Sequence, residues 1–190
     1  MFEKFSTEYR YLKKAGVISL ARRYFVMNSF DGILTTIGIL AGAQIGGIQD
    51  SRLVLTMCIS AGIAIAFRGA WGAFMTEQAE RALVLRKLDE TILEADEKIA
   101  LRKAHKSASY LVAFVDGFSP LMSTLIVASA FAFMPAKEAY NVAFAVAAAC
   151  LFLLGIILAR ISKENLIVSG AKMVFAGIAA AAVSFFILGS

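Results

Sequence analysis

Long stretches of apolar residues, interrupted by short polar segments, dominate this sequence of 190 residues. Five stretches are long enough to cross a bilayer as helices, which takes about 20 residues each. Apolar and polar positions do not alternate in them as they would in the strands of a membrane barrel, and helices satisfy the backbone within lipid. The pattern predicts an all-α integral membrane protein with five transmembrane helices, at Arg23–Ile48, Leu53–Met75, Ser109–Met134, Tyr140–Ala159 and Val168–Leu188.

The composition supports this class. Hydrophobic residues make up 59% of the chain and charged residues 17%, against about 45–50% and about 25% in soluble domains. These values exclude a disordered chain, a small disulfide scaffold and an ordinary soluble enzyme. Because the basic residues are not gathered on aromatic-rich strands, we expect the lipid bilayer rather than nucleic acid as the partner.

The basic residues predict an orientation. Six lie in residues 1–23, seven between the second and third spans and three around the last connection, which together are sixteen of the nineteen Lys and Arg. Positive charge is concentrated in cytoplasmic loops. We therefore expect a cytoplasmic N-terminus, an external C-terminus and a place in the cell membrane.

Two segments outside the spans have patterns of their own. Residues 1–22 mix aromatic residues with lysines, which is typical of an amphipathic segment lying on the inner leaflet, and residues 23–190 form the five-helix membrane domain. At about residues 76–107 the chain is polar, without Pro or Gly, and apolar residues recur at alternating spacings of three and four. This pattern predicts that the second helix continues as a long cytoplasmic helical extension.

Three charged residues fall inside the apolar spans: Asp31, Arg68 and Asp116. Each lies roughly 10 Å from the inner end of its helix at about 1.5 Å per residue. Since a charge at mid-membrane costs about 2.5–3.5 kcal/mol, we expect the three to face one another or a water-filled cavity. They form either a neutralising pair that fixes helix packing or a transport path, in which the surplus carboxylate is protonated or holds a cation.

Polar neighbours favour the path. Asn28 and Thr35 stand three residues before and four residues after Asp31, on the same helix face. Such oxygen atoms suit hard or borderline divalent ions, although hydroxyls in membrane helices also bond to their own helix. The predicted transport path comprises Asp31, Arg68, Asp116, Asn28 and Thr35.

Acidic residues line the predicted extension on two faces. Glu77 and Glu80 share one face, and Glu90, Glu94 and Glu97 share another. These residues either collect metal ions before transport or form a solvated face paired with lysines and arginines one turn away. The candidate metal ligands are therefore Asp31, Asp116, Glu77, Glu80, Glu90, Glu94 and Glu97.

Small residues also recur in the first span. Gly38, Gly42 and Gly46 form a doubled small-xxx-small pattern, which allows close approach of helices. We expect this face to pack a homodimer.

Catalytic motifs are not found. His105 is the single histidine, and the sequence has no zinc-protease, nucleophile-elbow or phosphate-loop motif. We therefore expect neither enzyme activity nor an organic cofactor.

The segment NSFDGILTTIGILAGAQIGG resembles the first-helix signature of the vacuolar iron transporter family. GAWGAFMTEQAERAL is similar to the exit of that family's second helix, DGFSPLMSTL to its third-helix Gly-x-x-Pro, and the tail GIILARISKENLIVSGAKMVFAGIAAAAVSFFILG to its fourth and fifth helices. The resemblance covers about residues 20–190.

This resemblance implies a dimer that moves Fe²⁺ or a related divalent ion such as Mn²⁺ out of the cytosol in exchange for protons. Asp31 matches the path-lining aspartate, and Glu77–Glu97 fall in the family's carboxylate-rich metal-binding region. The chain departs from the pattern at Arg68, where well-known members have Met, at Ser60, where they have Glu, and at Asp116, where the family is apolar. The alternative is a non-transporting membrane scaffold of the same fold.

Overall fold

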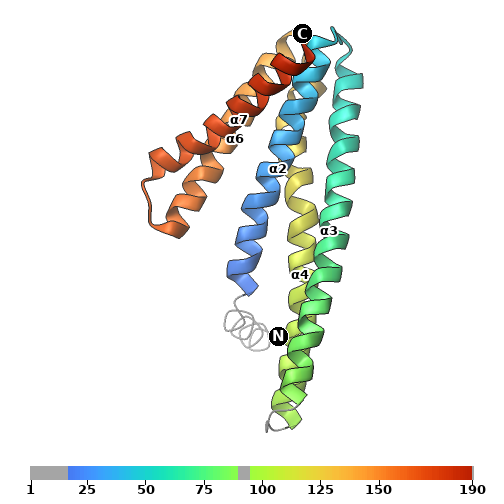
Figure 1. Cartoon of the computed structure of the whole chain (residues 1–190). Coiled ribbons are helices and arrows are strands. Elements are labelled where there is room, and N and C mark those ends of the chain that lie inside the picture. Colours follow the sequence, from blue (N-terminus) through green and yellow to red (C-terminus); the bar gives the residue numbers. More distant parts are fainter. Residues whose placement is uncertain (1–16, 90–94, 190) are drawn as a thin grey trace. The chain divides into compact units, whose positions relative to one another are not determined.

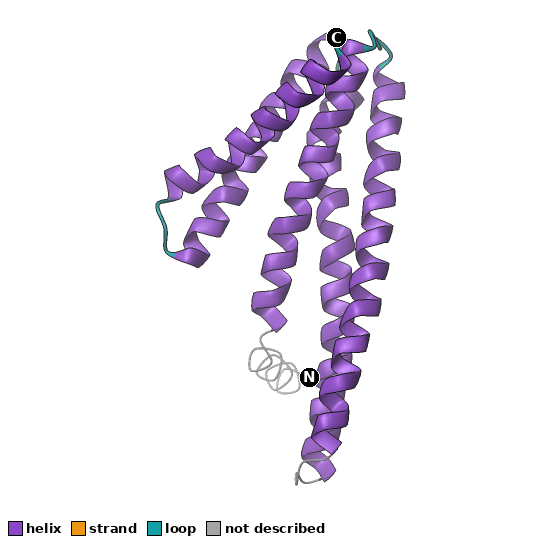
Figure 2. Cartoon of the chain, in the orientation of Figure 1, coloured by secondary structure: helices purple, strands orange, loops and turns teal. Residues whose placement is uncertain are grey.

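The computed structural model describes residues 17–89 and 95–189 of the chain. Most of the amphipathic segment expected at residues 1–22 therefore lies outside the described residues. All regular structure in the described ranges is helical (Figure 2). The helices are α2 (Val17–Ile45), α3 (Ser51–Asp89), α4 (Ala95–Ala128), α5 (Ala130–Phe133), α6 (Ala136–Ser162) and α7 (Leu166–Leu188).

Five of these helices contain segments long and apolar enough to cross a membrane, which confirms the predicted fold class. The segments are Ser19–Ile45, Ser51–Glu80, Tyr110–Ala128, Ala136–Ser162 and Leu166–Leu188.

Two spans end earlier than their hydropathy predicted, for local reasons. The first ends at Ile45 instead of Ile48, because the chain turns at Gly47 with φ of 68°, a conformation that glycine adopts without steric cost. The third ends at Ala128 instead of Met134. There the Ser129 hydroxyl donates to the Ile126 carbonyl at 2.7 Å, and the short α5 follows.

The second span continues as one long helix, as the sequence predicted. α3 has 39 residues and therefore extends about 58 Å at about 1.5 Å per residue, roughly twice the hydrocarbon thickness of a bilayer. α4 begins at Ala95 and reaches its own span at Tyr110 without a break. The membrane side on which these extensions lie is still a prediction.

The chain divides into two compact units, and three helices run from one unit into the other. The first unit comprises α2 up to Phe25, α3 from Phe67 and α4 up to Phe118. Its small apolar core consists of Ala73, Val112 and Ala113, against which Tyr24 packs.

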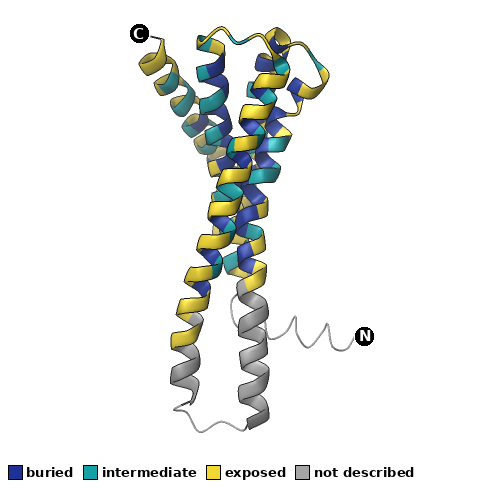
Figure 3. Cartoon of the chain, turned by 90° about the vertical axis from the view of Figure 1, so that its right-hand side faces the viewer, coloured by how far each residue is buried: buried dark blue, intermediate teal, exposed yellow. Residues whose placement is uncertain are grey.

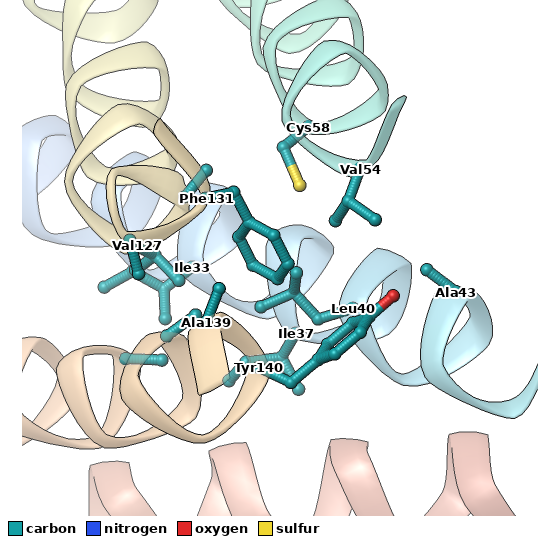
Figure 4. Packing of buried hydrophobic residues seen from close by; sticks show 14 of the residues in the cluster. Ile33, Ile37, Leu40, Ala43, Val54, Cys58, Val127, Phe131, Ala139 and Tyr140 are labelled. Atoms are coloured by element: carbon teal, nitrogen blue, oxygen red, sulfur yellow. The ribbon is translucent and has the colours of Figure 1, made fainter. Parts of the chain in front are cut away.

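The second unit comprises Val26–Ala66 and Ser119–Ser190 and has the larger apolar core. Figure 4 shows part of this cluster. In it the rings of Phe131 and Tyr140 pack edge to face, with their centroids 5.1 Å apart. The Tyr140 hydroxyl donates to the Ile48 carbonyl at 2.9 Å. This bond ties α6 to the turn that follows α2.

Within the second unit, α6 and α7 form an antiparallel hairpin (Figure 1). A Cβ atom on Gly155 would lie 2.5 Å from the Gly170 Cα atom, so the two glycines allow the backbones to approach closely. Figure 3 colours the ribbon by burial and shows many exposed positions along the helices. In α7 they include Phe175 and Phe186. Exposed apolar side chains along a spanning helix are expected where the surrounding solvent is hydrocarbon.

Candidate functional site

Two acidic side chains are buried in the first unit. Glu77 of α3 is 5% exposed and Asp116 of α4 is 7% exposed. The Tyr24 ring of α2 packs against the apolar cluster of Ala73, Val112 and Ala113 in the same unit. Tyr24, Glu77 and Asp116 thus come from three different helices and belong to one unit.

Asp116 is held by close backbone packing against α3. A Cβ atom on Gly69 would lie 2.8 Å from the Asp116 carbonyl oxygen and 3.2 Å from its Oδ2 atom. Pro120, one turn further along α4, has no N–H to donate to that carbonyl. Only a glycine at position 69 leaves room for Asp116 in this arrangement.

Arg68 and Glu80 of the same unit are exposed. Arg68 directly precedes Gly69, the residue of α3 against which Asp116 packs. Glu80 is the last residue of the α3 span. Glu77 differs from the solvated carboxylate that the acidic pattern suggested, because its side chain is buried.

Asp31 belongs to the second unit, and its side chain is exposed on the single chain although it lies well inside the α2 span. Asn28 and Thr35 are half-buried and lie on the same helix face at the spacing of one turn. A carboxyl, an amide and a hydroxyl are thus placed along one side of a membrane-spanning helix.

Two buried threonine hydroxyls join α2 to α4, and the one on α2 lies five residues after Asp31. The Thr36 hydroxyl donates to the Gly32 carbonyl at 2.7 Å and lies 3.2 Å from the Thr124 hydroxyl. A Cβ atom on Gly32 would lie 2.5 Å from the Pro120 carbonyl oxygen. The glycine directly after Asp31 therefore fixes the contact between the two helices.

The predicted metal ligands lie in different parts of the structure. Glu77 and Asp116 are buried in the first unit, whereas Asp31 belongs to the second unit and is exposed. Glu90 and Glu94 lie outside the described residues, and Glu97 lies in α4 at a position whose side chain is not described. Among the described side chains, no group of three or more His, Cys, Asp or Glu is placed to hold a metal ion.

Two of the three glycines of the predicted dimer face lie within α2. Gly38 has no atom within 4 Å of the position of an added Cβ, and Gly42 has one, the Leu188 Cδ1 atom at 3.6 Å. Gly46 lies in the turn after the helix ends. The helical part of the small-residue face is therefore Gly38 and Gly42.

Sequence reasoning missed Tyr24 and Gly69. Both residue types are common in membrane helices, so neither attracts notice without its neighbours. One signal was available: Gly69 directly follows Arg68, the single basic residue within the second apolar span predicted from the sequence. Close helix approach beside a buried charge is a frequent role of small residues in membranes.

Comparison with known proteins supports a common family. A family model described as the VIT family matches residues 91–189. An uncharacterised protein of Methanocaldococcus jannaschii is 30% identical over 168 residues, which cover 87% of each chain. The similarity therefore extends over most of the membrane domain.

Proposed function

Because the chain belongs to the VIT family, a family of membrane metal-ion transporters, we propose that it exports a divalent ion, Fe²⁺ or Mn²⁺, from the cytosol in exchange for protons. The proposed location is the cell membrane, with a cytoplasmic N-terminus and an external C-terminus. The observation that carries the proposal is an exposed carboxylate, Asp31, inside a membrane-spanning helix.

Asp31 is costly to leave against lipid. A charged group at the helix centre costs about 2.5–3.5 kcal/mol on insertion scales, so an ionisable residue at this depth marks a functional site by default. Carboxylate, amide and hydroxyl oxygens are ligands that divalent ions accept. We assign the binding of the passing ion to Asp31, with Asn28 and Thr35 beside it.

In the proposed function, a homodimer brings two copies of Asp31 together. Gly38 and Gly42 follow Asp31 on the same face of α2, and the space around Gly38 is open in the single chain. A two-fold interface brings the same patch of both subunits together, so α2 packing through these glycines places two copies of Asp31 near one axis. The ligand group that one described chain does not form is then completed by two chains.

The second aspartate has a different role in this proposal. Asp116 packs against Gly69. We assign the neutralisation of the Asp116 charge to Arg68, the residue directly before Gly69. The return of protons is assigned to the carboxylates of Asp31 and Asp116. Capture of the ion at the cytoplasmic side is assigned to Glu80 and to the acidic positions Glu90, Glu94 and Glu97.

Metal flux into proteoliposomes tests the proposal. We expect uptake of Fe²⁺ under anaerobic conditions and of Mn²⁺, with little uptake of Mg²⁺, and a pH-sensitive dye should report protons moving in the opposite direction. The Asp31→Asn variant keeps the shape but removes the charge. Since hydrogen bonds and contacts to a charged group contribute about 1.5–3 kcal/mol, its flux should fall about tenfold or more.

The matched control is Glu138→Gln. Glu138 is an exposed acid in the first turn of α6, so its loss changes the net charge equally without touching α2. Flux at background level in both the wild-type protein and Asp31→Asn would favour the membrane scaffold instead. Equal loss in Asp31→Asn and Glu138→Gln would show that only surface charge matters.

A further inference from the structure

Basic side chains gather at the connected end of the α6–α7 hairpin. Arg160 lies in the last turn of α6, Lys163 follows the helix in a left-handed conformation with φ of 60°, and Lys172 lies in α7. All three are exposed. Glu164 is the acid between them, and it accepts a hydrogen bond from the Ser169 hydroxyl at 3.2 Å. Three basic residues thus stand against one acidic residue.

An open groove of about 590 Å³ lies on α7 beside these charges. Its lining is apolar except for one lysine and comprises Ile167, Val168, Ala171, Lys172 and Phe175. These positions recur at the spacing of one helix face. The groove is much larger than the ~30 Å³ share of one water molecule, and Ile167 and Phe175 at its two ends are 71% and 72% exposed.

Lys172 lies within the α7 span, six residues after Leu166. This places its Cα atom about 9 Å along the axis at about 1.5 Å per residue. Side chains of a helix lean toward its N-terminus, and lysines in membrane helices extend their charged end toward the interface. We therefore expect the Lys172 ammonium to reach toward the end of the hairpin that carries Arg160 and Lys163, while its stem lines the apolar groove.

We propose that this groove binds an anionic phospholipid. The headgroup phosphate takes hydrogen bonds from Lys172 and charge from Arg160 and Lys163, and an acyl chain lies along Ile167 and Phe175. Basic pockets at the ends of membrane helices attract anionic headgroups. Free phosphate would leave the apolar lining unused, and a second copy of the same hairpin would bring like charges together.

Lipid titration of the purified protein tests the site directly. Binding of phosphatidylglycerol and of phosphatidylcholine with the same acyl chains is measured by native mass spectrometry in detergent. Near a membrane surface each Lys or Arg contributes about a fivefold preference for anionic lipid. We therefore expect wild type to prefer phosphatidylglycerol and Lys172→Gln to lose about fivefold of that preference, while Lys172→Arg keeps it.

Two further variants separate the parts of the site. Lys137→Gln is the matched control, because Lys137 is an exposed lysine at the start of α6, at the other end of the hairpin, and it should keep the preference. Phe175→Ala should weaken binding of both lipids, and inorganic phosphate should not displace them.

Three outcomes overturn the proposal: the same lipid preference in Lys172→Gln and wild type, an equal loss in Lys137→Gln, or complete displacement by inorganic phosphate. The measurement uses no metal ion and no transport. Its result is therefore independent of the fate of the proposed export activity.

Discussion

Two glycines three residues apart on α3 have opposite surroundings. An added Cβ at Gly69 would press on the Asp116 carbonyl oxygen at 2.8 Å, whereas at Gly72 it would meet no atom within 4 Å. Overpacking of a tight contact costs about 1–3 kcal/mol. We expect Gly69→Ala to lower the thermal unfolding temperature in detergent, because α4 has to move away from α3.

Gly72→Ala is the control for that experiment. Alanine has the better helix propensity by about 1 kcal/mol, so this variant should unfold at the same temperature as wild type or slightly higher. Equal destabilisation of the two variants would contradict the close packing of Asp116 on Gly69.

A single hydroxyl holds the turn after α2 to α6. Tyr140→Phe removes the donor to the Ile48 carbonyl, and one hydrogen bond contributes about 0.5–1.5 kcal/mol. A loss of that size in the free energy of unfolding is expected. Tyr110→Phe should change little, because the exposed Tyr110 contacts Phe74 through its ring, with the centroids 5.5 Å apart. A similar loss in both variants would refute the role of the Tyr140 hydroxyl.

At the scale of single residues, the sequence reveals charges but not their surroundings. Asp31, Arg68 and Asp116 could be identified because a charged residue in an apolar span is conspicuous. The burial of Glu77 could not, since it depends on the tertiary packing around α3. The spacing along one helix does not contain that information.

At the scale of helices, hydropathy predicted all five spans and the long continuation of α3. It misplaced the helix ends, because these depend on backbone chemistry at a few positions, such as Gly47 and Ser129. The hairpin of α6 and α7 follows from a short connection between two apolar helices. Its close contact depends on Gly155 facing Gly170, which hydropathy does not encode.

The hydroxyl contact between α2 and α4 leads to a prediction at this scale. Polar contacts between membrane helices contribute about 0.6 kcal/mol on average and up to about 1.7 kcal/mol. In a double-mutant cycle, Thr36→Val and Thr124→Val should show a coupling energy in that range, because their hydroxyls lie 3.2 Å apart. Unfolding of the single and double variants in detergent measures it.

Thr56 provides the control for the cycle. Its exposed hydroxyl donates within its own helix, to the Arg52 carbonyl at 2.7 Å, so Thr56→Val should combine additively with Thr36→Val. A coupling energy of zero between Thr36 and Thr124 would mean that their contact does not join the helices.

For the whole molecule, the proposed dimer depends on the open face of α2 around Gly38. A leucine at position 38 fits a single chain, because nothing lies within 4 Å of an added Cβ, but it obstructs the close approach of a second α2. We therefore expect Gly38→Leu to shift the protein from dimer to monomer by native mass spectrometry, and Gly72→Leu, at an equally open position on α3, to leave the dimer intact.

The same pair of variants tests whether the path lies between two subunits. If Asp31 functions only when two copies meet, monomeric Gly38→Leu should lose metal flux although its Asp31 is unchanged, and Gly72→Leu should retain it. A monomeric Gly38→Leu with full flux would place the path within one chain. A dimeric Gly38→Leu would show that the interface between the subunits does not pass through these glycines.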